Sequence, residues 1–140
     1  MGDMNHKGTK AQRDAISNAL NALSKEVVDA VFKVHSTLGP GLLESVYEAC
    51  LCRELKKRNV SFRRQVVLPV VYDGEEIEAG LRLDLWVEDK LIVELKAVEH
   101  LQEVHQAQLL TYLKLTGSRL GLLVNFNVPA IRQGIKRIIR

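Results

Sequence analysis

The sequence predicts an α/β domain in which two helices precede three antiparallel strands, and a crossover helix then leads to a further strand. Residues 62–72 and 75–87 alternate between apolar and polar side chains on either side of an Asp-Gly turn, which is typical of a β-hairpin. The helical period over residues 101–115 predicts the crossover helix. The apolar run over residues 119–126 predicts a strand that is buried on both faces.

The ends of the chain are predicted from composition and local spacing. Residues 1–22 are polar and rich in Asn and Ser, so we expect a flexible or loosely helical N-terminal arm. Residues 23–140 are expected to form a single domain, because 140 residues with 46% hydrophobic side chains suffice for one core. Residues 129–139 carry apolar and basic side chains at helical spacing, which predicts a C-terminal helix.

Two helices are expected to open the domain. Ser24 is a suitable N-cap for a helix over residues 25–38, and the Gly-Pro-Gly segment at residues 39–41 ends it because proline cannot continue a helix. A second helix is expected over residues 42–58, with Asn59 as its left-handed terminator.

Nothing in the sequence predicts a membrane or a secreted location. The charge-free stretch over residues 120–131 is too short to span a bilayer, and no apolar run follows the N-terminal charges. We therefore expect a cytoplasmic protein.

Cys50 and Cys52 lie two positions apart in a predicted helix, which is poor geometry for a disulfide, so both are expected to be reduced thiols.

Charge is distributed unevenly along the chain. Residues 53–64 hold six bases and one acid, a net charge of +5, whereas residues 73–103 hold ten acids and three bases, a net charge of −7. The last nine residues add four bases and no acid. Basic flanks around an acidic centre suit a polyanion-binding surface beside a cation site, and solvated faces of ordinary helices and strands remain an equal alternative.

The register of the second hairpin carries the main functional inference. With residues 88–90 as the loop, burial of one face pairs apolar side chains throughout, and a slip by one residue would mix the two faces. The apolar face then pairs Leu83 with Leu95, Leu85 with Val93 and Val87 with Leu91. The other face pairs Arg82 with Lys96, Asp84 with Glu94 and Trp86 with Ile92.

Two opposed carboxylates predict a cation between them. Cβ atoms of directly opposed residues lie about 4.5–5.5 Å apart, where like charges are destabilising unless a proton or cation intervenes. Mg²⁺ prefers one or two carboxylates with water and phosphate oxygens, and Lys96 projects from the same face as Asp84 and Glu94. A metal ion held by carboxylates beside an ammonium group can promote phosphodiester hydrolysis, because the metal activates water and stabilises developing negative charge. The alternative is a solvent-exposed pair neutralised by Arg82 and Lys96.

Two motifs resemble those of a known family. Asp84, followed after nine residues by Glu94-Leu95-Lys96, resembles the D…(D/E)xK signature of the PD-(D/E)XK nuclease superfamily. The segment LGPGLLESVYE resembles the motif that names the GxxExxY family of that superfamily, and the similarity extends over about residues 24–140. The resemblance implies a restriction-endonuclease-like αβββαβ core with an extra N-terminal element and a C-terminal helix. It also implies a metal-dependent nuclease.

The resemblance assigns roles to particular residues. It implies that Asp84 and Glu94 bind Mg²⁺ or Mn²⁺, that Lys96 positions or activates water, and that Glu44 completes the metal site. Gln108 and Tyr112 resemble the QxxxY element of some nuclease branches, which implies substrate contacts. Leu83 stands where the superfamily signature has proline, a common departure.

Other polar residues are candidates with ordinary structural alternatives. With Asp73-Gly74 as the turn, Arg63 is expected opposite Asp84 and Gln65 opposite Arg82. Both are predicted to contact substrate, although a salt bridge from Arg63 to Asp84 is the simpler alternative. The expected roles of the remaining three are packing for Tyr47, solvation for Glu48 and a surface position for His105.

The sequence thus predicts a metal-dependent nuclease that hydrolyses DNA or RNA, with nucleic acid as partner and no membrane. A homodimer is left open. The alternative is a non-catalytic nuclease-like module that binds nucleic acid or a protein partner, and a weaker one is hydrolysis of a small phosphate ester. Few aromatic residues, 5% of the chain, argue against a base-stacking platform.

Overall fold

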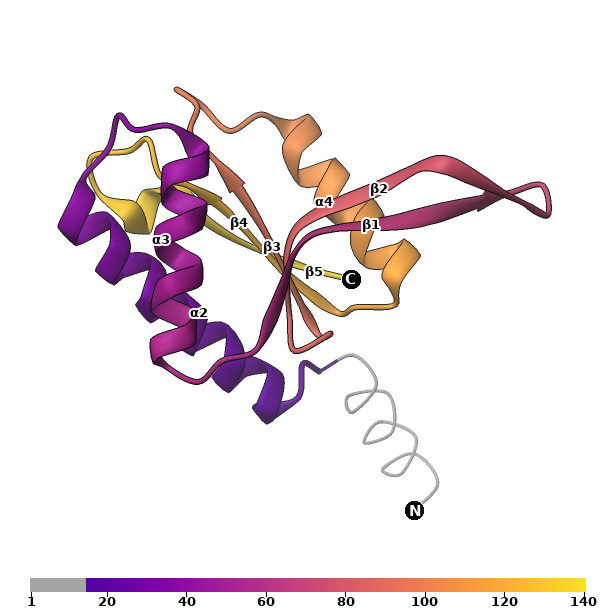
Figure 1. The fold of residues 1–140 in the computed structure, drawn as a ribbon, viewed down its shortest axis with the longest axis horizontal. Coiled ribbons are helices and arrows are strands. Elements are labelled where there is room, and N and C mark those ends of the chain that lie inside the picture. Colours follow the sequence, from indigo (N-terminus) through magenta and orange to yellow (C-terminus); the bar gives the residue numbers. More distant parts are fainter. Residues whose placement is uncertain (1–14) are drawn as a thin grey trace, which may run out of the picture.

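A five-stranded mixed sheet forms the centre of the computed structural model, which describes residues 15–140 (Figure 1). The strands follow the order β1-β2-β3-β4-β5, and all neighbours are antiparallel except the parallel pair β3 and β4. Their bounds are Phe62–Tyr72, Glu75–Val87, Leu91–Lys96, Leu120–Asn125 and Ile135–Ile139. The parallel pair is joined by the predicted crossover helix, so the restriction-endonuclease-like α/β class is confirmed.

Helices cover both faces of this sheet. Helices α2 (Asn18–Leu38) and α3 (Glu44–Lys57) pack on one face in a large apolar cluster that includes Val27, Leu51 and Leu85. Helix α4 (Glu103–Thr116) packs on the other face in a smaller cluster with Leu83 and Ile92. Burial of apolar side chains on both faces explains why β3 and β4 are almost continuously apolar.

Helix α2 begins earlier than the sequence predicts. Its N-cap is Ser17, whose hydroxyl accepts a hydrogen bond from the amide of Leu20 at 3.1 Å, so the prediction of Ser24 as N-cap is wrong. Ser24 is a buried residue inside the helix. The segment 18–22, predicted as part of an arm, is therefore helical, and Leu20 belongs to the core. Residues 1–14 of the predicted arm lie outside the described residues.

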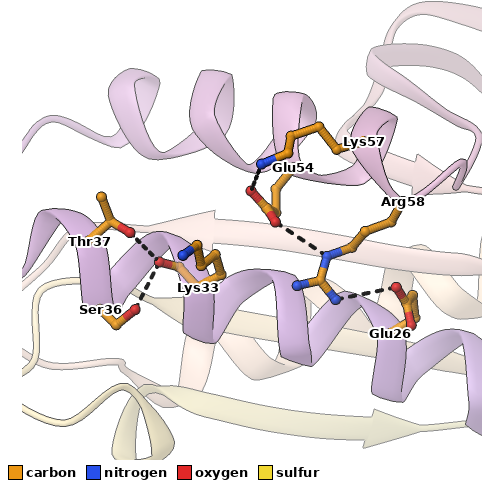
Figure 2. Close-up of polar contacts among 7 residues, drawn as sticks. All are labelled: Glu26, Lys33, Ser36, Thr37, Glu54, Lys57 and Arg58. Atoms are coloured by element: carbon orange, nitrogen blue, oxygen red, sulfur yellow. Dashed lines mark hydrogen bonds and ion pairs between the residues drawn. The ribbon is translucent and has the colours of Figure 1, made fainter.

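Helices α2 and α3 are joined by polar contacts on their outer side (Figure 2). The carboxylate of Glu54 lies 3.7 Å from the ammonium of Lys57 and 3.4 Å from the guanidinium of Arg58. Arg58 also pairs with Glu26 of α2 at 3.2 Å. Lys57 at the end of α3 and Arg58 just beyond it are thus paired with carboxylates of the same molecule.

The loop between α2 and α3 is fixed by a buried tyrosine. The Tyr47 hydroxyl donates to the carbonyl of Gly39 at 2.6 Å and accepts from the amide of Leu42 at 3.1 Å. Its ring stacks on Phe126 with centroids 4.4 Å apart. The packing role predicted for Tyr47 is confirmed, and the contacts hold the N-terminal end of α3, including Glu44, against the end of β4.

The C-terminal segment differs from the prediction. Residues 131–134 form a 3₁₀ turn, and residues 135–139 form strand β5, so the predicted helix over residues 129–139 is wrong. The apolar side chains of Ile135 and Ile138 suit either structure, but pairing with β4 supplies backbone hydrogen bonds that a short isolated helix holds only marginally. The molecule therefore ends in an edge strand.

The turn before β5 depends on a glycine, which gives a test of the fold. A Cβ on Gly134 would lie 2.1 Å from the carbonyl oxygen of Asn125, a backbone atom that has little freedom to move. We expect Gly134→Ala to lower the free energy of unfolding by roughly 2–4 kcal/mol, measured by urea denaturation. Gly74→Asn is the control, because a Cβ there meets no atom within 4 Å and Asn tolerates its φ of 80°. Equal stability of both variants would contradict the close approach.

The register of the second hairpin is confirmed at its closed end. Leu85 pairs with Val93, Trp86 with Ile92 and Val87 with Leu91, as predicted. Leu83 departs from the prediction, since it packs in the α4 cluster rather than with Leu85 and Val87. Regular pairing of β2 with β3 ends at Leu85. Beyond that point the side chains need not alternate between the two faces of the sheet as they do at the closed end of the hairpin, so Leu83 can face α4.

The first hairpin has a different register from the predicted one. The Asp73-Gly74 turn pairs Tyr72 with Glu75, but the pairing shifts by two residues between Leu68 and Val70. Pro69 lies at this irregularity, and a Cβ on Gly80 would lie 1.9 Å from the carbonyl oxygen of Leu68. As a result Arg63 pairs with Trp86, and the predicted pairs Arg63–Asp84 and Gln65–Arg82 are wrong.

Three further findings concern the sequence expectations. Within residues 15–140 no helix is both long and apolar enough to cross a membrane. Cys50 is half-buried and Cys52 is buried, and both are free thiols, as predicted. Asn59 has a φ of 58° just beyond α3, which confirms it as the left-handed terminator.

Candidate metal and catalytic site

Asp84 and Glu94 meet where the regular pairing of β2 and β3 stops. The Oδ2 atom of Asp84 accepts a hydrogen bond from the amide of Leu95 at 2.8 Å. The Oε2 atom of Glu94 lies 3.4 Å from the amide of Asp84. Each carboxylate thus contacts the backbone of the opposite strand. The two acids lie on neighbouring strands, as predicted.

Among the described residues, Glu94 has the pKa that departs furthest from its ordinary value. Its side chain is 5% exposed, and its Oε1 atom is buried without a hydrogen-bond partner. Burial, followed by the hydrogen bond and the negative charge of Asp84, raises the pKa of Glu94 to about 10. The amide of Asp84 and the ammonium of Lys96 oppose this rise. A buried, unpartnered carboxyl oxygen beside a second carboxylate is unfavourable unless another group binds there.

Lys96 and Glu44 approach these carboxylates from two elements. Lys96 ends β3, and its positive charge opposes the rise in the pKa of both Glu94 and Glu44 that burial causes. Glu44 begins α3, where burial and the negative charge of Asp84 raise its pKa. The fold therefore brings four predicted residues, Glu44, Asp84, Glu94 and Lys96, within electrostatic range of one another.

Helix α4 supplies the opposite wall of the site. Burial, followed by the negative charges of Glu94 and Asp84, raises the pKa of the Tyr112 hydroxyl, and hydrogen bonding by Gln108 opposes the rise. Gln108 and Lys96 also line an open groove of ≈ 490 Å³. The groove continues along α4 past Val104, His105, Ala107 and Thr111. Gln108 and Tyr112 therefore lie beside the carboxylates, and their substrate contacts stay a prediction.

The donor set suits a hard divalent cation. Carboxylate oxygens are the protein ligands that Mg²⁺ and Mn²⁺ prefer, and Oε1 of Glu94 has no partner that a cation would displace. Among residues 15–140, however, no three or more His, Cys, Asp or Glu side chains gather as a metal-binding group. The pair Asp84 and Glu94 fits a cation that keeps several waters, and a metal contact from Glu44 stays a prediction.

A contact network beside the site includes a residue that the sequence analysis placed in solvent. Glu48 is 8% exposed and accepts hydrogen bonds from Arg64 at 2.7 Å and from Gln65. The expectation that Glu48 is solvated is therefore wrong. Its three- and four-residue spacing from Glu44, Leu51 and Cys52, which puts it on the half-buried side of α3, is the signal that could have indicated burial.

Gln65 occupies the place predicted for Arg63. It lies between Arg64 and Val66, which pair with Leu85 and Leu83, so Gln65 lies across from Asp84. Its φ of 50° is left-handed, which a non-glycine residue adopts only when neighbouring contacts hold it there. Here the bond to Glu48 holds it. Gln65 thus lies beside Asp84 because of the register shift, which the sequence analysis did not predict.

Arg63 is engaged away from the carboxylates. Its guanidinium pairs with Asp89 and lies 4.7 Å from the centre of the Trp86 ring. The salt bridge to Asp84 weighed from the sequence is therefore not formed. His105 lies at the start of α4, where its Nδ1 atom accepts from the amide of Gln102 at 3.0 Å, so it caps the helix.

Comparison with known proteins agrees with this architecture. A family model described as the PD-(D/E)XK nuclease superfamily matches residues 21–138, a span that includes strands β1 to β4, helices α3 and α4 and every residue of the candidate site. Comparisons with curated proteins and with solved structures found no match. On the match over most of its length, the chain belongs to the PD-(D/E)XK nuclease superfamily.

Proposed function

We propose that this protein is a metal-dependent nuclease that hydrolyses phosphodiester bonds of DNA or RNA at the site formed by Asp84, Glu94 and Lys96. The observation that carries the proposal is the pairing of Asp84 with the buried Glu94, which has one unpartnered oxygen and an ammonium nearby. Membership of a nuclease superfamily supports the same chemistry. We further propose that the chain is a GxxExxY protein, because its Gly41, Glu44 and Tyr47 match the naming motif.

Some residues of the site would bind the metal ion, and others would position the attacking water and the phosphate. Asp84 and Glu94 would hold Mg²⁺ or Mn²⁺, which supplies charge stabilisation and a lowered pKa for bound water. Lys96 donates hydrogen bonds either to the attacking water or to a phosphate oxygen as negative charge develops there. Gln108 and Tyr112 line the approach and orient the phosphate by hydrogen bonds from the amide and the hydroxyl. Glu44 would contribute a third carboxylate from the start of α3.

The charge of the molecule favours a polyanionic substrate. The segment 53–64 carries a net charge of +5, and Arg53 and Lys56 on α3 are exposed. Phosphate contacts require only cations within reach and are independent of base sequence. We therefore propose nucleic acid as the substrate, bound through its backbone.

Calorimetric titration with Mn²⁺ tests the metal site before any substrate is known. We expect binding to the parent protein and a loss of at least tenfold in affinity in Asp84→Asn, which keeps the shape of the side chain and removes its charge. Asp29→Asn is the matched control, because Asp29 is exposed on α2. Equal titration curves for the parent and Asp84→Asn would contradict the proposal.

A non-catalytic module is the second candidate, and one observation favours it. Within the described part of the chain the acids do not gather into a three-donor group. A protein that had kept the fold and lost the reaction would bind nucleic acid with strong salt dependence and would cut none of the tested substrates with Mg²⁺ or Mn²⁺. That result, together with absent Mn²⁺ binding, would replace the nuclease proposal.

A further inference from the structure

The hairpin of β1 and β2 projects beyond the helices as an arm (Figure 1). We define the arm as residues 67–78. It exposes four large apolar side chains, namely Val67 at 63%, Val71 at 65%, Tyr72 at 74% and Ile77 at 39%. Monomeric proteins seldom leave several such side chains exposed on one projecting element. The arm therefore has the composition of a contact surface.

The arm is also strongly acidic. Asp73, Glu75, Glu76 and Glu78 are exposed at and beside its tip. Within residues 15–140 none of the four forms an ion pair. Their charge repels nucleic acid and would repel a second acidic arm. The surface that fits the arm is accordingly basic and partly apolar.

Strand β5 offers such a surface on the same chain. It is an edge of the sheet, and edge strands present unpaired backbone groups to a partner. We define the β5 edge as β5 with Arg132 and Arg140. It exposes the four bases Arg132, Lys136, Arg137 and Arg140, and Ile139 is 50% exposed among them. The four bases match the four acids of the arm in number.

The other basic region fits the arm less well. Four of the six bases in residues 53–64, namely Lys57, Arg58, Arg63 and Arg64, already pair with carboxylates of the same molecule, as Figure 2 shows for Lys57 and Arg58, whereas Arg53 and Lys56 are exposed. In the part of the chain that the structure describes, no base of the β5 edge has such a carboxylate partner. Arg137 and Arg140 bond only to neutral oxygens, those of Asn21, Gly117 and Ser118. Among the described residues, the β5 edge thus combines four bases that pair with no carboxylate and the open backbone of an edge strand.

We propose that the arm of one molecule docks on the β5 edge of a second copy, and that the second arm docks reciprocally on the first molecule. The C-terminal end of β5 points toward the side from which the arm projects (Figure 1). A two-fold axis on that side brings each arm against the other edge, and such an isologous contact closes at a dimer. The proposal does not depend on the nuclease activity, because no residue of the carboxylate site takes part.

Charge exchange between the two surfaces tests this dimer by analytical ultracentrifugation. The arm variant carries Glu75→Lys and Glu76→Lys. The edge variant carries Arg132→Glu and Lys136→Glu, side chains for which the structure gives no hydrogen bond among the described residues. Each variant alone cancels the net charge of one surface and brings like charges together at both contacts, so it is expected to raise the dimer dissociation constant at least tenfold. An equimolar mixture restores full attraction between the unchanged arm and the unchanged edge and places reversed charges against reversed charges at the other contact, so we expect a 1:1 heterodimer.

Three controls separate docking from general effects. Asp29→Lys and Lys56→Glu reverse charges at exposed sites outside both surfaces and should leave the dimer unchanged. Tyr72→Ser should weaken the dimer in high salt as well as in low salt, because it removes apolar contact rather than charge. Unchanged melting temperatures show that the variants fold. A parent protein that stays monomeric up to about 100 µM, or a mixture of variants that stays monomeric, would overturn the proposal.

Discussion

Replacing Lys96 with alanine is expected to slow phosphodiester cleavage by roughly 10²–10³-fold, the usual effect of removing one donor that stabilises charge in the transition state. Lys96 lies at the end of β3, close enough to Glu94 and Glu44 that its charge opposes the burial-driven rise in the pKa of both. It also lines the groove along α4. Because it is half-buried at the rim and belongs to neither apolar cluster, the substitution should leave the melting temperature nearly unchanged.

Three measurements make this prediction specific. Single-turnover cleavage should fall, whereas Mn²⁺ titration should show retained or slightly tighter binding, because a nearby positive charge has been removed. Lys96→Arg should keep part of the rate, since it keeps the charge but changes the geometry. Lys90→Ala, an exposed lysine in the turn before β3, is the control. Cleavage by Lys96→Ala at the parent rate would exclude a catalytic role.

The site could be predicted from the sequence where burial constrains the register. The pairs of Leu85 with Val93 and of Val87 with Leu91 follow from apolar alternation alone, and they bring Asp84 and Glu94 together on neighbouring strands just beyond the paired segment. That reasoning needs no knowledge of the helices. It works because a shift by one residue would expose one complete apolar set.

Predictions failed where local patterns were compatible with two structures. The residues of β1 alternate equally well in either register, and the shift near Pro69 depends on how closely the backbone of Gly80 approaches Leu68. The C-terminal segment has apolar spacing that suits a helix, but the open edge of β4 is a tertiary feature that decides for a strand. Neither of these determinants is present in a window of a few residues.

Glu48 shows a different limit. An acid on a helix next to a catalytic candidate is most often solvated, and nothing in its own segment indicates the partners Arg64 and Gln65. Those partners come from β1, at positions set by the register that local patterns could not determine. The contacts around Asp84 therefore depend on the assembled sheet and not on any one segment.

Glu94→Gln is expected to stabilise the protein in the absence of divalent cations, in contrast to most substitutions of buried residues. Burial and the neighbouring Asp84 raise the pKa of Glu94 to about 10 from its ordinary value of 4.5. Between these values the folded protein holds a proton that the unfolded chain releases. The free energy of unfolding of the parent therefore falls as pH rises through this window. Glutamine carries no such proton, so its advantage should grow with pH.

Urea denaturation with a chelator at pH 6 and at pH 8 measures this effect. We expect Glu94→Gln to exceed the parent by roughly 1–3 kcal/mol at pH 8, the usual cost of a poorly satisfied buried polar group, and by less at pH 6. Glu99→Gln, which removes an exposed carboxylate just beyond β3, should match the parent at both pH values. A variant less stable than the parent at both pH values would show that the carboxyl group of Glu94 is not penalised by its surroundings.

Adding Mn²⁺ should reverse the order of stability. A ligand that binds only the folded state stabilises it in proportion to the logarithm of its concentration above the dissociation constant, so the parent gains and Glu94→Gln gains little. The same buried carboxylate then lowers stability without the cation and supplies a ligand when the cation is present. If saturating Mn²⁺ left both proteins with unchanged melting temperatures, the unpartnered oxygen of Glu94 would need an explanation other than metal binding.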